Sequence, residues 1–399
     1  MREKRLLILL LLLFLLLSGC GAQDAPAPPP TPEAATAPTP IPTPSPTPAP
    51  TPTPEPDYPA GPAVTVDGQA LASGSVQIDG VAYAALDEYA AAAPLTAAEG
   101  DGYLWRGREL SVAAGDTALR YGEKETALDG PVTRWHERLW VPVESFSRAL
   151  EIGVFDDSEL GQLYCTPAAG DWALPEGYAV PVFMYHGVSA YAMWEPELFV
   201  RPEDLETQLQ WLADNGWETI WFSDLEHVQD YEKPILLTFD DGLMNNYTDC
   251  YPLLQKYGAK ATFFVCPRFI ESGDVNYMQA DEIKELAVSG LVDIQSHSYT
   301  HYPDIGQLLN ADLRYQLGDS QLYLTRLTGK QPYVFCYPCG KESSFVRQVL
   351  PEYYRFGLKM SGPSCYVTGD DPTLVYRYYV RRYDGEAMLH RYLDPLNLG

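Results

Sequence analysis

Short apolar runs alternate with amphipathic segments along the second half of the chain, from residue 176 to residue 399. The run Ile235–Phe239 is almost continuously apolar, as a strand buried on both faces requires. Upstream of it, Leu205, Leu209 and Leu212 have the spacing of one face of a helix. The alternation predicts parallel strands covered by helices, in a barrel or an open sheet, with the chemistry at the carboxyl ends of the strands. The other predicted strands are Val180–Tyr185, Thr219–Phe222, Thr262–Val265, Val292–Ile294 and Val334–Tyr337.

Residues 63–170 have a different pattern, with short strands that end in Asp-Gly turns at Gly68 and Gly80. Two stretches of this region, 81–89 and 138–146, each consist of a predicted strand followed by a short amphipathic segment. We therefore expect a small α+β domain ahead of the α/β domain.

The amino-terminal residues 1–20 have the pattern of an export signal. Arg2, Lys4 and Arg5 precede an unbroken apolar run from Leu6 to Leu17. As a helix this run would span about 18 Å, which is short of the ~30 Å hydrocarbon core of a bilayer. The sequence Leu-Ser-Gly-Cys that ends at Cys20 resembles the lipobox of bacterial lipoproteins. That resemblance implies cleavage before Cys20 and lipidation of its sulfur; the alternative is a short uncleaved anchor.

Residues 21–62 are rich in proline and threonine, and 17 of the 35 prolines of the chain lie between Pro26 and Pro62. Such a segment favours polyproline II and cannot bury a core. We expect it to act as a spacer that holds the folded part away from the membrane. These two segments together predict a lipid-anchored protein on the extracellular face of a bacterial cell membrane, reaching into the cell wall.

The net charge of the chain limits the classes of partner that it can bind. The chain has 27 Lys and Arg against 54 Asp and Glu, a net charge of −27. A field of this sign excludes general attraction to nucleic acid or to anionic lipid headgroups. The hydrophobic content of 46% excludes a disordered chain.

Three strand ends of the α/β region carry candidate chemistry. Asp240 and Asp241 follow the strand Ile235–Phe239, and His297 and His301 follow the strand Val292–Ile294. Two imidazoles four residues apart can reach one metal ion if their segment makes a helical turn, although the zinc-protease pattern H-E-x-x-H is absent. Two histidines and one carboxylate are a three-ligand set typical of a catalytic metal. The second carboxylate is then free to act as a general base, because a metal lowers the pKa of water towards ~7.

The third strand end is the sequence Phe-Cys-Tyr-Pro-Cys-Gly at residues 335–340. Together with Thr238–Gly242 and His297–His301, it resembles the polysaccharide deacetylase family (the NodB-homology, carbohydrate esterase 4 group). The opening Val180–Gly187 is similar to that of surface-attached members. The resemblance implies a distorted (β/α) barrel and the metal-dependent removal of N-acetyl groups from glycans.

The same resemblance assigns roles by position. It makes Asp240 the catalytic base and makes Asp241, His297 and His301 the metal ligands. It assigns to the backbone N–H of Cys339 a share in holding the oxyanion. Zinc is the first expectation for the metal, with cobalt, nickel or manganese as alternatives.

The sequence departs from the family pattern in two places. The family often has an arginine, which tunes the base, where Cys336 stands here, so we expect Asp240 to be less well poised. The late Leu-x-His motif that supplies the general acid has only a weak counterpart, which ends at His390. His186 is a rival candidate for the acid, and Asp240 itself could return its proton.

The segment 63–170 carries a second resemblance. Trp140–Val143, leading into Phe146 and Leu150, resembles the copper amine oxidase N-terminal-like domain, a small α+β module of surface proteins. The name implies no copper here, because His136 is the one histidine of this stretch. We interpret the module as a packing or wall-contacting domain.

Six cysteines remain besides Cys20, and in an exported protein they allow 15 disulfide pairings. Cys336 and Cys339 form a C-x-x-C pair, which we interpret as free thiols or a structural bridge in preference to a redox site.

The expected activity is therefore hydrolysis of N-acetyl groups on a cell-surface polysaccharide, either peptidoglycan or poly-N-acetylglucosamine. Two alternatives stay open. One is a glycan-binding surface lipoprotein whose deacetylase site is degenerate. The other is a non-haem Fe(II) oxygenase, which also uses two histidines and a carboxylate. The sequence leaves the oligomeric state open.

Overall fold

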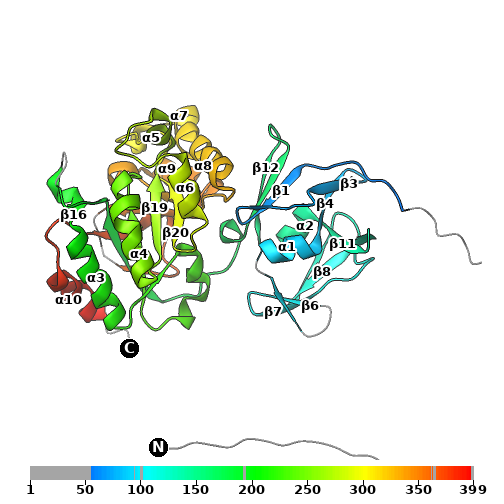
Figure 1. The fold of residues 1–399 in the computed structure, drawn as a ribbon, viewed down its shortest axis with the longest axis horizontal. Coiled ribbons are helices and arrows are strands. Elements are labelled where there is room, and N and C mark those ends of the chain that lie inside the picture. The colour runs from blue at the N-terminus through cyan, green and yellow to red at the C-terminus, as the bar shows by residue number, and fades with distance from the viewer. Residues whose placement is uncertain are drawn as a thin grey trace, which may run out of the picture. The chain divides into compact units, whose positions relative to one another are not determined.

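The computed structural model describes residues 55–396, apart from 94, 99–101, 192–194, 361, 363 and 364 (Figure 1). The predicted signal peptide with Cys20, and residues 21–54 of the predicted linker, lie outside the described residues. Within the described ranges, no helix is both long enough and apolar enough to span a bilayer.

A closed ring of seven parallel strands forms the carboxyl-terminal domain, which confirms the predicted barrel. β14 pairs with both β18 and β24, and this double pairing closes the ring. β17 (Glu218–Ile220) pairs beside β18, and β23 (Cys365–Val367) runs antiparallel to β14. In ring order the strands are β14 (Ala179–Tyr185), β18 (Pro234–Phe239), β19 (Ala261–Val265), β20 (Val292–Ser296), β21 (Val334–Cys336), β22 (Phe356–Met360) and β24 (Val375–Tyr379).

Alternate residues of the barrel strands pack into two different cores, as strands buried on both faces require. On β18, Leu236 belongs to one hydrophobic cluster, while Ile235 and Leu237 belong to another that also contains the leucines of α3. Thr238 and Asp240 continue the series of Leu236 at intervals of two, so they share its face. The helices of this domain are α3 (Pro202–Asp214), α4 (Tyr251–Tyr257), α5 (Pro267–Ser272), α6 (Ala280–Ala287), α7 (Asn310–Arg314), α8 (Ser320–Thr328), α9 (Ser344–Val349) and α10 (Glu386–Leu393).

The region before the barrel folds as short sheets around two small helices. β4 (Val81–Ala85) leads into α1 (Leu86–Ala92), and β11 (Arg138–Pro142) leads into α2 (Val143–Ala149), which confirms the repeated strand-and-helix pattern. The two strands pair antiparallel with each other. The remaining strands are β1 (Ala63–Val66), β2 (Gln69–Ala70), β3 (Ser75–Ile78), β5 (Thr96–Ala97), β6 (Gly102–Trp105), β7 (Arg108–Ser111), β8 (Ala118–Tyr121), β9 (Lys124–Ala127), β10 (Thr133–Trp135), β12 (Gly153–Asp157) and β13 (Gln162–Thr166).

The end of the predicted linker is part of this small domain. The Nε1–H of Trp135 donates to the carbonyl of Pro56 over 3.0 Å, and Ala60 bridges Val76. The N–H of Gly61 donates to the carbonyl of Ser75 over 2.9 Å. Residues 56–61, which belong to the expected linker, therefore make backbone and aromatic contacts with the small domain.

The small domain contacts barrel segments that immediately precede strands. Arg326 donates from Nε and Nη2 to the buried carboxylate of Asp157, over 2.6 and 2.8 Å. Gln331 donates its N–H to the hydroxyl of Thr166, shortly before β21 begins. Arg106 pairs with Glu226, which lies ahead of β18. The small domain thus covers the amino ends of the barrel strands and leaves their carboxyl ends free.

Candidate metal centre and catalytic cavity

Six of the seven predicted catalytic and metal-ligating residues line one cavity of about 370 Å³ at the carboxyl ends of the barrel strands. His390 does not line it. Five further residues complete the wall. The lining is His186, Glu195, Leu198, Asp240, Asp241, Phe269, Tyr277, His297, His301, Cys339 and Met360.

Asp241, His297 and His301 converge as a metal-ligand set requires. The Asp241 Oδ1 lies 3.3 Å from the Nε2 of His297 and 3.4 Å from the Nε2 of His301. One ligand atom from each of the three residues lies within 4.8 Å of the others. The Nδ1 of His297 is 2.8 Å from the carbonyl of Cys336, a bond that fixes the ring and turns Nε2 towards Asp241. Two imidazole nitrogens and a carboxylate oxygen fit a divalent metal such as zinc.

The pKa values of the two imidazoles shift in opposite directions. Burial and the charge of His297 lower the pKa of His301, which favours the neutral ring that a metal ligand must present. Burial would also lower the pKa of His297, but Cys336 and Asp241 raise it well above its ordinary value. A metal ion would therefore compete with a proton at His297.

The three motif segments hold unusual backbone conformations. Asp241, Ser298, His301 and Cys339 have positive φ angles of 73°, 63°, 53° and 54°. A left-handed conformation at such residues costs of the order of 1–3 kcal/mol and is concentrated at functional sites. Ser298 and His301 also show that the segment is not the expected helical turn. A bend with two left-handed residues brings the second histidine back to the first.

Asp240 is held by an arginine that the sequence analysis missed. Arg377 on β24 donates from Nη1 to Oδ1 and from Nη2 to Oδ2, each over 2.7 Å, and both side chains are buried. Its Nη1 also reaches the hydroxyl of Thr238. Burial alone would raise the pKa of the Asp240 carboxyl, but the charge and hydrogen bonds of Arg377 hold it far below its usual range. The carboxylate therefore stays ionised in a buried site.

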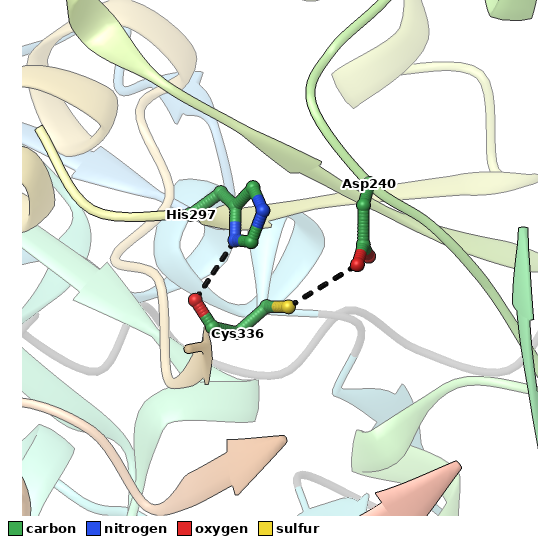
Figure 2. Close-up of side chains that lie close together, drawn as sticks. All are labelled: Asp240, His297 and Cys336. Carbon is green, nitrogen blue, oxygen red and sulfur yellow. Dashed lines mark hydrogen bonds between the residues drawn. The ribbon is translucent and has the colours of Figure 1, made fainter. Parts of the chain in front are cut away.

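The arginine reaches Asp240 through the space that Cys336 leaves. The Sγ of Cys336 lies 3.0 Å from the Arg377 Nη2. It also lies 3.4 Å from the Asp240 Oδ2 (Figure 2). An arginine from another strand therefore pairs with Asp240 although position 336 is a cysteine, and how well Asp240 is poised as a base stays a prediction. One feature of the sequence does point to Arg377. It lies two residues after the apolar Val375, and residues two apart on a strand share a face, so Arg377 lies on the buried face and needs a partner for its charge.

Asp240, His297 and Cys336 form a second group that is close enough to hold a metal (Figure 2). Both carboxylate oxygens of Asp240 already accept from Arg377, and the Nδ1 of His297 is engaged by the Cys336 carbonyl. Burial raises the pKa of the Cys336 thiol, which keeps it protonated. A cation would also face the guanidinium, so the group with Asp241 and His301 is the better site.

The two candidate general acids lie in different places. His186 is 8% exposed, lines the cavity, and its Nδ1 has no hydrogen-bond partner among the described residues. His390 lies on α10, where Nδ1 is 3.0 Å from Asp394 and Nε2 is 3.4 Å from Glu386. The geometry favours His186 for a role in the cavity, because His390 is occupied by two carboxylates away from it.

All six cysteines among the described residues are free thiols. Cys339 is exposed in the cavity wall, whereas Cys336 is buried behind it, and no bridge joins them.

The barrel domain has counterparts among known proteins. The sequence model of the polysaccharide deacetylase family matches residues 227–357. The protein YxkH of Bacillus subtilis (strain 168), named for the same family, is 33% identical over 167 residues, which cover 41% of this chain and 57% of YxkH. The peptidoglycan-N-acetylmuramic acid deacetylase PdaA of the same strain is 32% identical over 127 residues, which cover 32% of this chain and 44% of PdaA.

The fold has a counterpart among solved structures. Streptococcus pyogenes deacetylase PplD, in complex with acetate, aligns with a TM-score of 0.51 at 22% identity, over 54% of this chain and 99% of PplD. The chain spans about half the length of the two curated relatives above. The barrel domain is thus similar to the polysaccharide deacetylase family over residues 227–357.

Proposed function

We propose that this protein is a metal-dependent deacetylase that hydrolyses N-acetyl groups on a cell-surface polysaccharide and releases acetate. The observation that carries the proposal is the convergence of Asp241, His297 and His301 beside a separate, buried and ionised Asp240. A binding protein has no need of a carboxylate kept charged against burial, whereas a hydrolase needs a base.

Each residue of the cavity has a role in this proposal. Asp241, His297 and His301 would hold the metal, which when bound polarises the acetamide carbonyl and makes water more acidic. Asp240 accepts the proton of the attacking water. Arg377 positions Asp240 and keeps its carboxylate ionised, without contacting substrate. The Cys339 N–H donates to the developing oxyanion, a donor typically worth about 3–4 kcal/mol. His186 protonates the leaving amine.

The substrate and location are part of the proposal. The predicted lipid anchor on Cys20 and the proline-rich spacer place the enzyme outside the cell membrane, within reach of the wall. That location supports peptidoglycan or poly-N-acetylglucosamine as the substrate, and PdaA, by its name, acts on peptidoglycan. Zinc is the metal that the ligand set supports first, with cobalt, nickel and manganese behind it.

The test is acetate release from a panel of acetylated glycans by purified protein, with metal analysis and with a chelator arm. We expect release from at least one N-acetylated glycan, its loss with the chelator, and its return when zinc is added. Release that needs no oxygen or 2-oxoacid would exclude an oxygenase. Glycan binding without acetate release by the metal-loaded protein would favour the degenerate binding protein and contradict the proposal.

A further inference from the structure

The catalytic cavity is small for a polysaccharide. At about 370 Å³ it lies near the lower end of the ~300–1,000 Å³ typical of ligand pockets, enough for one sugar residue. A polymer whose acetamide reaches Asp241 must therefore continue across the rim. This step rests on the proposed function, because only a polymeric substrate needs a rim site.

Two strongly exposed tyrosines lie on segments that follow strands at the carboxyl end of the barrel. Tyr191 is 81% exposed and Tyr383 is 74% exposed, which is unusual for such large rings. Tyr191 follows the short strand β15 (Gly187–Val188), which comes directly after β14, and Tyr383 follows β24. β14 and β24 are paired neighbours in the barrel, so both loops leave its carboxyl end side by side.

A buried arginine ties the two loops together. The Nη2 of Arg382 donates to the carbonyl of Ala190 over 2.7 Å, and its Nη1 donates to the carbonyl of Phe199 over 2.8 Å. Each tyrosine is thus one residue away from an end of the Arg382–Ala190 bond. These hydrogen bonds hold the backbone beside each tyrosine in place, and a site that is held in place before binding loses less entropy when a ligand arrives.

The loop that carries Tyr191 also reaches the cavity. Residues Glu195 and Leu198 of this loop line the cavity wall before the chain returns to the Phe199 carbonyl that Arg382 binds. Described residues between Tyr191 and Phe199 thus belong to the cavity wall. The described residues that line the cavity include Glu195, Asp240 and Asp241 and no lysine or arginine, so the cavity disfavours an anionic glycan.

We propose that Tyr191 and Tyr383 form an aromatic surface that binds the pyranose rings next to the sugar being deacetylated. The C–H faces of a pyranose are apolar and its hydroxyls are polar, and a phenol ring offers both kinds of contact with few rotatable bonds. The occupant is an uncharged N-acetylhexosamine chain of several residues. A single sugar in the cavity does not touch this surface.

The test compares N-acetylglucosamine dimers and hexamers, in β-1,4- and β-1,6-linked series, on the full chain. In the double variant Tyr191→Ala/Tyr383→Ala we expect KM for the hexamer to rise about tenfold, with kcat unchanged. The KM for the dimer should rise less, because a dimer places only one ring on the surface. Phe at both positions restores the hexamer KM if the ring faces do the binding. The matched control is Tyr178→Ala, an exposed tyrosine before the amino end of β14, which should change neither substrate.

Direct binding of the same oligomers, measured by calorimetry, separates this inference from the proposed function. Wild-type protein should bind the hexamer more tightly than the dimer, and the double variant should bind both alike. Equal hexamer affinity in wild type and double variant, or no preference for the hexamer in either series, overturns the aromatic surface. Absence of acetate release with this binding pattern intact overturns the deacetylase and not the surface.

Discussion

Asp240 and Asp293 are aspartates of the same barrel, at its opposite ends, and their pKa values move in opposite directions. Asp240 follows β18 at the carboxyl end, and Asp293 is the second residue of β20 at the amino end. Burial favours the neutral acid in both. Arg377 overcomes that effect at Asp240, whereas Asp293 has the hydroxyl of Tyr333 at 2.9 Å and its pKa rises to about 6.

The difference shows that the partner, not the burial, decides the charge of a carboxyl group in this barrel. A bidentate guanidinium supplies a full opposite charge and two hydrogen bonds, while a phenol supplies one hydrogen bond and no charge. The free end of the barrel therefore keeps an ionised base beside its cavity. The end covered by the small domain holds a carboxyl group that is neutral at mildly acid pH.

Removing the guanidinium should have the largest effect on stability. In Arg377→Met the buried Asp240 loses its charge partner, and we expect the free energy of unfolding to fall by about 3–5 kcal/mol, together with activity. Urea denaturation measures the loss. Adding Asp240→Asn to Arg377→Met should recover part of the stability, because no buried charge then remains unpaired. A loss below about 1 kcal/mol in the single variant would show that Asp240 does not depend on this pair.

Replacing Asp293 by asparagine should raise the stability of the protein, and it should do so only above acid pH. The folded-state pKa of Asp293, about 6, exceeds the ordinary aspartate pKa of 3.8, so the folded state binds more protons between these values. Stability of the wild type should therefore fall as pH rises from about 4 to 6. Asp293→Asn removes this dependence, with a gain over wild type of up to about 3 kcal/mol at pH 8 and almost none near pH 4.

The control for this variant is Asp281→Asn, at an exposed position on α6. It should leave the pH dependence of unfolding as in the wild type. If Asp293→Asn destabilises the protein equally at pH 4 and pH 8, the raised pKa is not the cause and the comparison fails.

A smaller effect is expected where the small domain meets the amino end. Arg326→Ala leaves the buried Asp157 without its guanidinium, and we expect a loss of about 1–2 kcal/mol of stability with kcat unchanged. Lys330→Ala removes a more exposed pair with Asp67 and should cost less. Thermal unfolding and acetate release measure the two effects. A fall in kcat with Arg326→Ala would mean that the covered end takes part in the chemistry.

The sequence was most informative where the chemistry was local. A few residues of sequence are enough to show two adjacent carboxylates after an apolar strand and two histidines four residues apart. These four side chains line the cavity, as the sequence predicts. Arg377 was missed because its partner lies 137 residues away and its strand, Val-Tyr-Arg-Tyr-Tyr, lacks an apolar run. The residues next to Arg377 in the sequence do not indicate which acidic side chain pairs with it.

The sequence was also unable to identify the general acid. His390 and His186 are equivalent as residue types, and only the tertiary arrangement separates a histidine in the cavity from one between Glu386 and Asp394. The bend at 297–301 was also beyond sequence spacing, because it depends on left-handed backbone at Ser298 and His301. The roles of these residues, and the domain boundaries, remain predictions.

Metal content and acetate release, measured together on wild type, Asp241→Ala and Asp240→Asn, test the account most directly. We expect one equivalent of divalent metal in the wild type and its loss, with activity, in Asp241→Ala. In Asp240→Asn we expect the metal to stay while activity falls about 10²–10⁴-fold, the usual contribution of a general base. Full metal and full activity in Asp241→Ala, or loss of the metal in Asp240→Asn, would contradict the division of roles between these adjacent carboxylates.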